Sequence, residues 1–143
     1  MDVTVGLARA DAGALLVDTG TTLSEAAVIE ADVRAITNSP VTRIVLTHKH
    51  FDHVLGSAGF PRAEIYCAPQ VAEYMSAPAA KLRADALRHG AGAAEVDRAI
   101  AALHRPGHMV YDTGSRRCRG RGVRPRAAST YRHCDETQSG NVI

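Results

Sequence analysis

Three histidines and one aspartate stand within six residues of this sequence, at His48, His50, Asp52 and His53. Alternate residues of an extended chain point to the same side, so His48 and His50 can face one ion. A turn after them can bring Asp52 and His53 toward the same cavity. Imidazole nitrogens and carboxylate oxygens suit zinc, and a set without thiolate also suits iron or manganese. The spacing therefore predicts a metal site.

The segments around this cluster alternate between strand and helix patterns. Residues 3–8 and 14–18 predict a strand hairpin, and residues 43–47 predict a third strand directly before the histidines. Between them, Thr22 and Glu25 have the spacing of a helix capping box. A strand, a helix and a strand in this order predict a βαβ unit with a parallel pair. Ligands of such sheets bind at the carboxyl ends of strands, where the histidines stand.

Other patterns fill in the rest of the first 112 residues. One apolar face of the first helix is predicted from residues at three- and four-residue steps, namely Ala26, Ile29, Val33 and Ile36. Residues 63–67 predict a strand that ends on Cys67, which we expect to be buried. Ala, Leu, Arg and Glu dominate from Pro69 to about His104, so we expect two or three helices there, with His89 near a helix end.

Charge and composition divide the chain near residue 112. Residues 1–112 carry 10 basic and 13 acidic side chains, whereas residues 113–143 carry 7 arginines and 2 acids. The second segment has no periodic apolar pattern, so it cannot offset its ordering entropy by burial. We expect a domain over 1–112 and an Arg-rich, irregular or disordered tail over 113–143. A shifted reading frame is a second interpretation of this tail.

The same composition limits the class of protein. The sequence contains no apolar run of 18 or more residues, and its start does not resemble a secretory signal. The three cysteines form no C-x-x-C pair, so a disulfide framework is not expected. We expect a cytoplasmic protein with a small-molecule substrate and no membrane partner.

The residues His48–His53 resemble the H-x-H-x-D-H signature of the metallo-β-lactamase superfamily. The strand end Leu16–Gly20, LVDTG, is similar to the motif that precedes this loop in that family. The resemblance spans roughly residues 3–112. It implies an α/β fold that corresponds to about one βα half of the family's αββα sandwich, and thus a truncated member.

The resemblance also implies a reaction and a role for each residue. His48 and His50 would bind a first zinc ion, and Asp52 and His53 a second. Asp18 would stand behind the loop and hold it by hydrogen bonds. A metal-bound hydroxide would attack an ester, thioester, lactone, amide or phosphoester, with Asp52 as the catalytic residue.

The sequence departs from the family's pattern after the loop. A later histidine, a bridging aspartate and a final histidine are typical of the family, and no position matches them clearly. His108, in RPGHMV, has the most similar local sequence, although the stretch before it predicts helix. Two alternatives to a hydrolase therefore stay open: a metal-binding fragment without activity, and a nucleic-acid-binding protein that uses the Arg-rich tail.

Overall fold

A computed structural model of the chain describes residues 3–10 and 13–110. Five strands form one sheet in the order β1-β2-β3-β4-β5. They are β1 (Gly6–Ala10), β2 (Gly13–Val17), β3 (Val41–Leu46), β4 (Glu64–Cys67) and β5 (His108–Met109). Strand β1 pairs antiparallel with β2, and every later pair is parallel. The predicted hairpin and βαβ unit are therefore confirmed. The expected domain boundary after residue 112 and the expected disorder of 113–143 lie outside the described residues.

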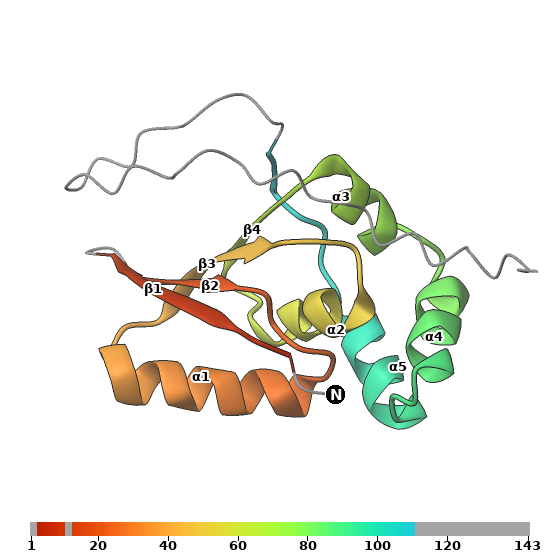
Figure 1. Cartoon of the computed structure of the whole chain (residues 1–143), viewed down its shortest axis with the longest axis horizontal. Helices are drawn as coiled ribbons and strands as arrows, with labels where there is room; N and C mark the ends of the chain where they lie inside the picture. The colour runs from red at the N-terminus through yellow and green to blue at the C-terminus, as the bar shows by residue number, and fades with distance from the viewer. Residues whose placement is uncertain (1–2, 11–12, 111–143) are drawn as a thin grey trace, which may run out of the picture. The chain divides into compact units, whose positions relative to one another are not determined.

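The helices follow the strands in the expected alternation (Figure 1). Helix α1 joins β2 to β3, and a one-turn helix and a 3-10 helix follow the histidine cluster. Three helices lie between β4 and β5, where the sequence predicted two or three. The bounds are α1 (Leu23–Thr37), α2 (Phe51–Val54), η1 (Leu55–Gly59), α3 (Pro69–Met75), α4 (Ala79–Arg88) and α5 (Ala93–Ala102).

Helix α1 begins with the predicted capping box. Glu25 N–H donates to the Thr22 hydroxyl at 3.1 Å, and Thr22 N–H donates to the Glu25 carboxylate at 3.0 Å. Of the predicted apolar face, Ala26 and Val33 are buried, whereas Ile36 is 65% exposed. The prediction was wrong for Ile36, because ten residues of a helix rotate it about 80° from the direction of Ala26. Thr37 is buried in its place.

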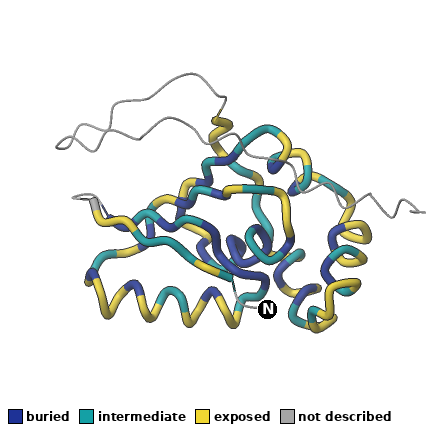
Figure 2. Tube along the Cα trace, viewed as in Figure 1, coloured by how far each residue is buried: buried dark blue, intermediate teal, exposed yellow. Residues whose placement is uncertain are grey.

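One face of the sheet carries the core. Leu16, Ile44 and Ile65 point to this face with almost no exposure, and they pack in one cluster with Ala26 and Val33 of α1. Cys67 belongs to the same cluster and is buried as expected. Figure 2 shows buried residues concentrated along the central strands and the segment after the histidine loop. Helices on this face of a single sheet correspond to half of an αββα sandwich.

The opposite face of the sheet is partly exposed among the described residues. Leu15, Val17 and Val45 are of intermediate burial, and Arg43 and Glu64 are exposed beside them. In the part of the chain that the structure describes, no helix combines the length and apolar character that a membrane crossing needs.

Candidate metal centre

The histidine cluster lies at the carboxyl end of the parallel pair β2–β3. Strand β3 ends at Leu46, and Thr47 to His50 lead into α2. Asp18 directly follows the neighbouring strand β2, and its N–H donates to Val45 O at 2.9 Å. The carboxyl ends of parallel strands lie at the same edge of a sheet. The loop after β2 and the loop after β3 therefore face each other there.

Asp18 holds the loop by two hydrogen bonds. Its Oδ1 accepts from the Thr47 N–H at 2.9 Å, and its Oδ2 accepts from the Thr47 hydroxyl at 2.7 Å. The residue is 4% exposed and has a φ of 64°, a left-handed conformation that Asp tolerates better than most residues. The expectation that Asp18 holds the loop by hydrogen bonds is confirmed.

Hydrogen bonds also join the turn after Asp18 to α2 and η1. Both the N–H and the hydroxyl of Thr19 donate to His53 O, at 3.1 and 2.9 Å, and Gly56 N–H donates to Gly20 O at 2.8 Å. A Cβ on Gly56 would stand 2.0 Å from Thr19 O, so only glycine fits this position. These contacts fix the distance between Asp18 and His53.

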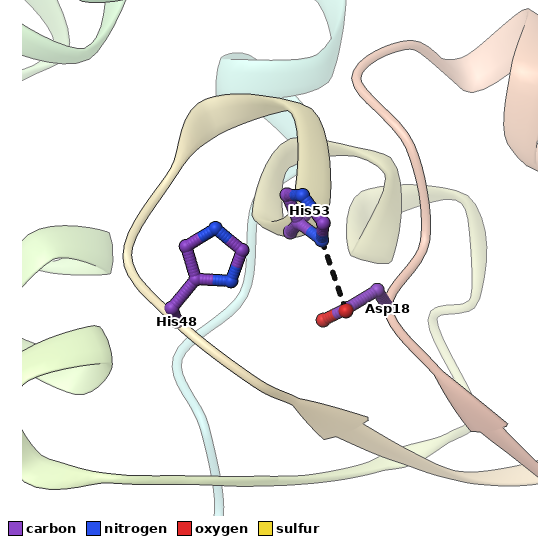
Figure 3. Close-up of side chains that lie close together, drawn as sticks. All are labelled: Asp18, His48 and His53. Atoms are coloured by element: carbon purple, nitrogen blue, oxygen red, sulfur yellow. Dashed lines mark ion pairs between the residues drawn. The ribbon is translucent and has the colours of Figure 1, made fainter. Parts of the chain in front are cut away.

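Asp18, His48 and His53 each offer a ligand atom, and these atoms all lie within 4.8 Å of one another (Figure 3). The imidazole rings of His48 and His53 are 4.1 Å apart between centroids. His53 Nδ1 lies 2.9 Å from Asp18 Oδ2. The buried Nδ1 has no hydrogen bond within the described residues. A buried imidazole nitrogen without a hydrogen bond fits a group that binds or orients on a metal ion.

His48 and His50 come together beside this group. Because the Thr47 hydroxyl donates to Asp18, it accepts from His48 Nδ1 at 2.9 Å. The proton on Nδ1 leaves a lone pair on His48 Nε2, which lies 3.1 Å from His50 Nδ1. Two nitrogens that bind one tetrahedral zinc ion stand about 3.3 Å apart, from bond lengths of about 2.0–2.1 Å. The observed separation fits a shared ion.

Asp52 stands at the edge of this arrangement. Its Oδ2 lies 3.9 Å from His53 Nε2, and it is not part of the close group of three. His53 therefore has a carboxylate on each side of its ring, Asp18 at Nδ1 and Asp52 at Nε2.

The electrostatics keep His48 in the form that binds metals. Burial, followed by the neighbouring His53 and His50 rings, lowers the pKa of His48 below its ordinary value of 6.5. Asp18 and Asp52 oppose this shift without reversing its direction. Neutral imidazole is the ligand form, so a lowered pKa keeps His48 available for a metal at neutral pH.

His108, the sequence candidate for a third histidine, lies elsewhere. It stands on β5, where its ring stacks on Tyr66 at 4.4 Å and its Nε2 lies 3.9 Å from Glu64. It does not belong to the group of Asp18, His48 and His53. Sequence reasoning also missed Thr47, which links Asp18 to His48. A threonine directly before the first histidine was visible, but its partners depend on the pairing of β2 with β3.

An open groove of about 470 Å³ lies beside the start of α1. It is lined by Val3, Val5, Gly20, Thr21, Ser24, Glu25, Val28 and Ile29. None of the residues His48–His53 lines it, so the groove and the histidine cluster are separate features.

Comparison with known proteins gives a family match over most of the chain. The family model of the metallo-beta-lactamase superfamily matches residues 1–119. No curated protein matches.

Three solved structures are similar to parts of the chain. A metallo-β-lactamase from Erythrobacter litoralis, with β-mercaptoethanol in its active site, is 28% identical over 47% of this chain and 30% of its own, with a TM-score of 0.43. A double mutant of the sec-alkyl sulfatase PisA1 is 23% identical over 48% and 12%, with a TM-score of 0.42. The metallo-β-lactamase FIM-1 from Pseudomonas aeruginosa, in its mono-zinc form, is 19% identical over 73% and 37%, with a TM-score of 0.45. The chain thus spans less than two fifths of each of these proteins.

Proposed function

The chain belongs to the metallo-β-lactamase superfamily, and on this premise we propose that it is a zinc-dependent hydrolase of a small-molecule substrate. The bond cleaved is an ester, thioester, lactone, amide or phosphoester. The observation that carries the proposal is the convergence of Asp18, His48 and His53 within 4.8 Å, with His50 3.1 Å from His48.

Each residue of the loop has a role in this proposal. His48 Nε2 and His50 Nδ1 would bind one ion, because these two nitrogens lie 3.1 Å apart, close to the separation of two ligands on one tetrahedral zinc ion. Asp52 and His53 would bind a second ion, and Asp52 is the proposed catalytic residue. Asp18 would hold the loop from behind through its two hydrogen bonds with Thr47.

The ion supplies the chemistry that these side chains lack. When bound, zinc lowers the pKa of a coordinated water and polarises the substrate. The protein contributes the position of the donors and a half-buried setting for His48, whose lowered pKa keeps it neutral. With nitrogen and oxygen donors only, iron or manganese can take the place of zinc.

Metal content tests this proposal directly. The purified chain is expected to retain one or two zinc ions, measured by elemental analysis after dialysis. His50→Ala should lose at least one of them, whereas His108→Ala, which removes a histidine outside the group, should keep the wild-type content. Equal metal content in wild type and His50→Ala would contradict the proposed site.

Turnover separates the hydrolase from a metal-binding fragment without activity. Zinc-dependent cleavage of a chromogenic β-lactam, an aryl ester or an aryl phosphodiester, lost on treatment with a chelator, is the result expected for the hydrolase. Retention of zinc without turnover of any of these substrates would favour the fragment.

A further inference from the structure

Phe51 stands inside the histidine loop, directly between His50 and Asp52, yet its side chain belongs to a hydrophobic cluster. It is 5% exposed. The other buried members of this cluster, which is distinct from the core on the sheet, are Leu55, Ala86, Val96 and Ala99. Ala86 lies on α4, and Val96 and Ala99 lie on α5. The Phe51 ring thus connects the loop to the pair of helices α4 and α5.

A histidine outside the metal group also contacts this ring. His89 follows the last residue of α4 and is exposed. Its ring stacks on Phe51, with 5.5 Å between the centroids and 23° between the planes. The expected position of His89 at a helix end is confirmed. Phe51 is therefore held both by the apolar cluster and by the end of α4.

Helix α2 depends on such contacts for its orientation. It has four residues, Phe51 to Val54, and a helix of one turn is not stable by itself. Val54 is fully buried in the core on the sheet, whereas Phe51 is buried in the cluster with α4 and α5. These two anchors in different clusters, together with the hydrogen bonds from Thr19 to His53 O, set how α2 is rotated about its axis.

The two candidate ligands of α2 lie between these anchors. Successive residues of a helix are about 100° apart, so any rotation of α2 moves Asp52 and His53 together. We propose that Phe51 is a positioning residue of the metal centre. Its ring, fixed by α4, α5 and His89, sets the rotation of α2 and thereby directs Asp52 and His53 to the metal. The inference rests on the proposed function, because it requires those two side chains to bind the ion.

The test compares two variants that remove similar amounts of buried apolar volume. Phe51→Leu keeps an apolar side chain but removes the ring. Ile65→Val trims a side chain of the core on the sheet that is 1% exposed and lies on β4. Each is made in the full chain, loaded with Co²⁺ and titrated by visible absorption, and the thermal unfolding of the metal-free form is measured beside it.

Both variants should lower the unfolding temperature, but only one should change the metal centre. Phe51→Leu is expected to weaken Co²⁺ binding about tenfold, the lower range for residues that orient ligands, and to alter the Co²⁺ absorption bands. Ile65→Val should bind Co²⁺ like the wild type, with the same bands. His89→Ala, a change at an exposed residue, should weaken binding about threefold through the lost ring contact.

Several outcomes overturn the inference. Co²⁺ affinity and bands in Phe51→Leu that match those of Ile65→Val would show that the ring only adds stability. If Phe51→Leu does not fold, His89→Ala decides, and wild-type binding in that variant overturns the proposal.

A fourth variant separates this inference from the proposed function. Wild-type binding of Co²⁺ by His48→Ala would contradict the metal site itself, and the role of Phe51 would fail with it. Loss of binding in His48→Ala together with unchanged binding in Phe51→Leu would overturn the role of Phe51 alone.

Discussion

Two of the histidine–carboxylate pairs among the described residues differ in distance, in exposure and in the hydrogen bonds around them. His53 and Asp18 lie 2.9 Å apart, with side chains 20% and 6% exposed. His108 and Glu64 lie 3.9 Å apart, with side chains 48% and 54% exposed. The first pair is fixed by hydrogen bonds from two loops, whereas the second lies on the exposed face of β4 and β5. Residue type alone therefore does not make a site, because burial and convergence decide what a pair can do.

The largest expected effect comes from the glycine that brings the two loops together. Gly56→Ala would place a Cβ 2.0 Å from Thr19 O, and the other atoms that it would meet are also backbone atoms of Thr19 and Gly20, which cannot move aside as a flexible side chain can. We expect a loss of about 3 kcal/mol or more in the free energy of unfolding. Urea unfolding of the metal-free protein measures it.

The matched change beside His108 provides the control. A Cβ on Gly107 meets nothing within 4 Å, so Gly107→Ala should change the free energy of unfolding by less than about 0.5 kcal/mol. Similar losses in the two variants would show that the regions do not differ as described.

Removal of each carboxylate is expected to give the next largest difference. Asp18→Ala leaves the Thr47 N–H and hydroxyl without their acceptor and places alanine at a φ of 64°. We expect a loss of about 2–3 kcal/mol in the free energy of unfolding. Glu64→Ala breaks only exposed contacts and should cost about 0–1 kcal/mol. Chemical unfolding of both variants checks the order, and a larger cost for Glu64→Ala would reverse the comparison.

The pH dependence of the free energy of unfolding should show the lowered pKa of His48. Its pKa in the folded chain is below 6.5 because of burial and the neighbouring histidines. Below that value the unfolded chain binds a proton that the folded chain does not, so stability falls as the pH falls. His48→Ala should show a shallower decline between about pH 7 and 5.5 in metal-free protein. Urea unfolding over a pH series measures both slopes, and identical slopes would count against the shift.

The smallest effect is expected at His108. Its exposed contacts with Tyr66 and Glu64 predict that His108→Ala changes the free energy of unfolding by less than about 0.5 kcal/mol. Calorimetry of zinc binding should give wild-type affinity. Weaker zinc binding in this variant would show that His108 contributes to the site despite its position.

The local features of the fold were largely predictable from the sequence. The capping box of α1, the hairpin β1–β2 and the strand before the histidines follow from short-range patterns, and each is confirmed. Strand β1, however, begins at Gly6 and not at Val3, since its pairing with β2 ends where Gly6 faces Val17. Ile36 is exposed for a similar reason. Steps of three and four residues only approximate the helical period of 3.6, so the last residue of the predicted face has rotated away from the buried side.

The residue types of the candidate site were visible in the sequence, but their grouping in space was not. The spacing of His48, His50, Asp52 and His53 is a property of the sequence, whereas the approach of Asp18 to His53 depends on parallel pairing across 35 residues. The burial of Phe51 depends on Ala86 of α4 and on Val96 and Ala99 of α5, which come 35 residues or more after it. Long-range packing of this kind has no signature in a short motif.

The strand order has a consequence for how the chain folds. Each strand pairs with the one before it in the sequence, from β1 to β5. All the contacts of Asp18, Thr19 and Gly20 with the histidine loop are complete by Gly56. These contacts close smaller loops than contacts between Phe51 and the later helix α5, and a smaller loop loses less entropy when it closes. The two loops around the histidines can therefore meet before α4 and α5 pack against them, and Phe51 is fixed only when those helices dock.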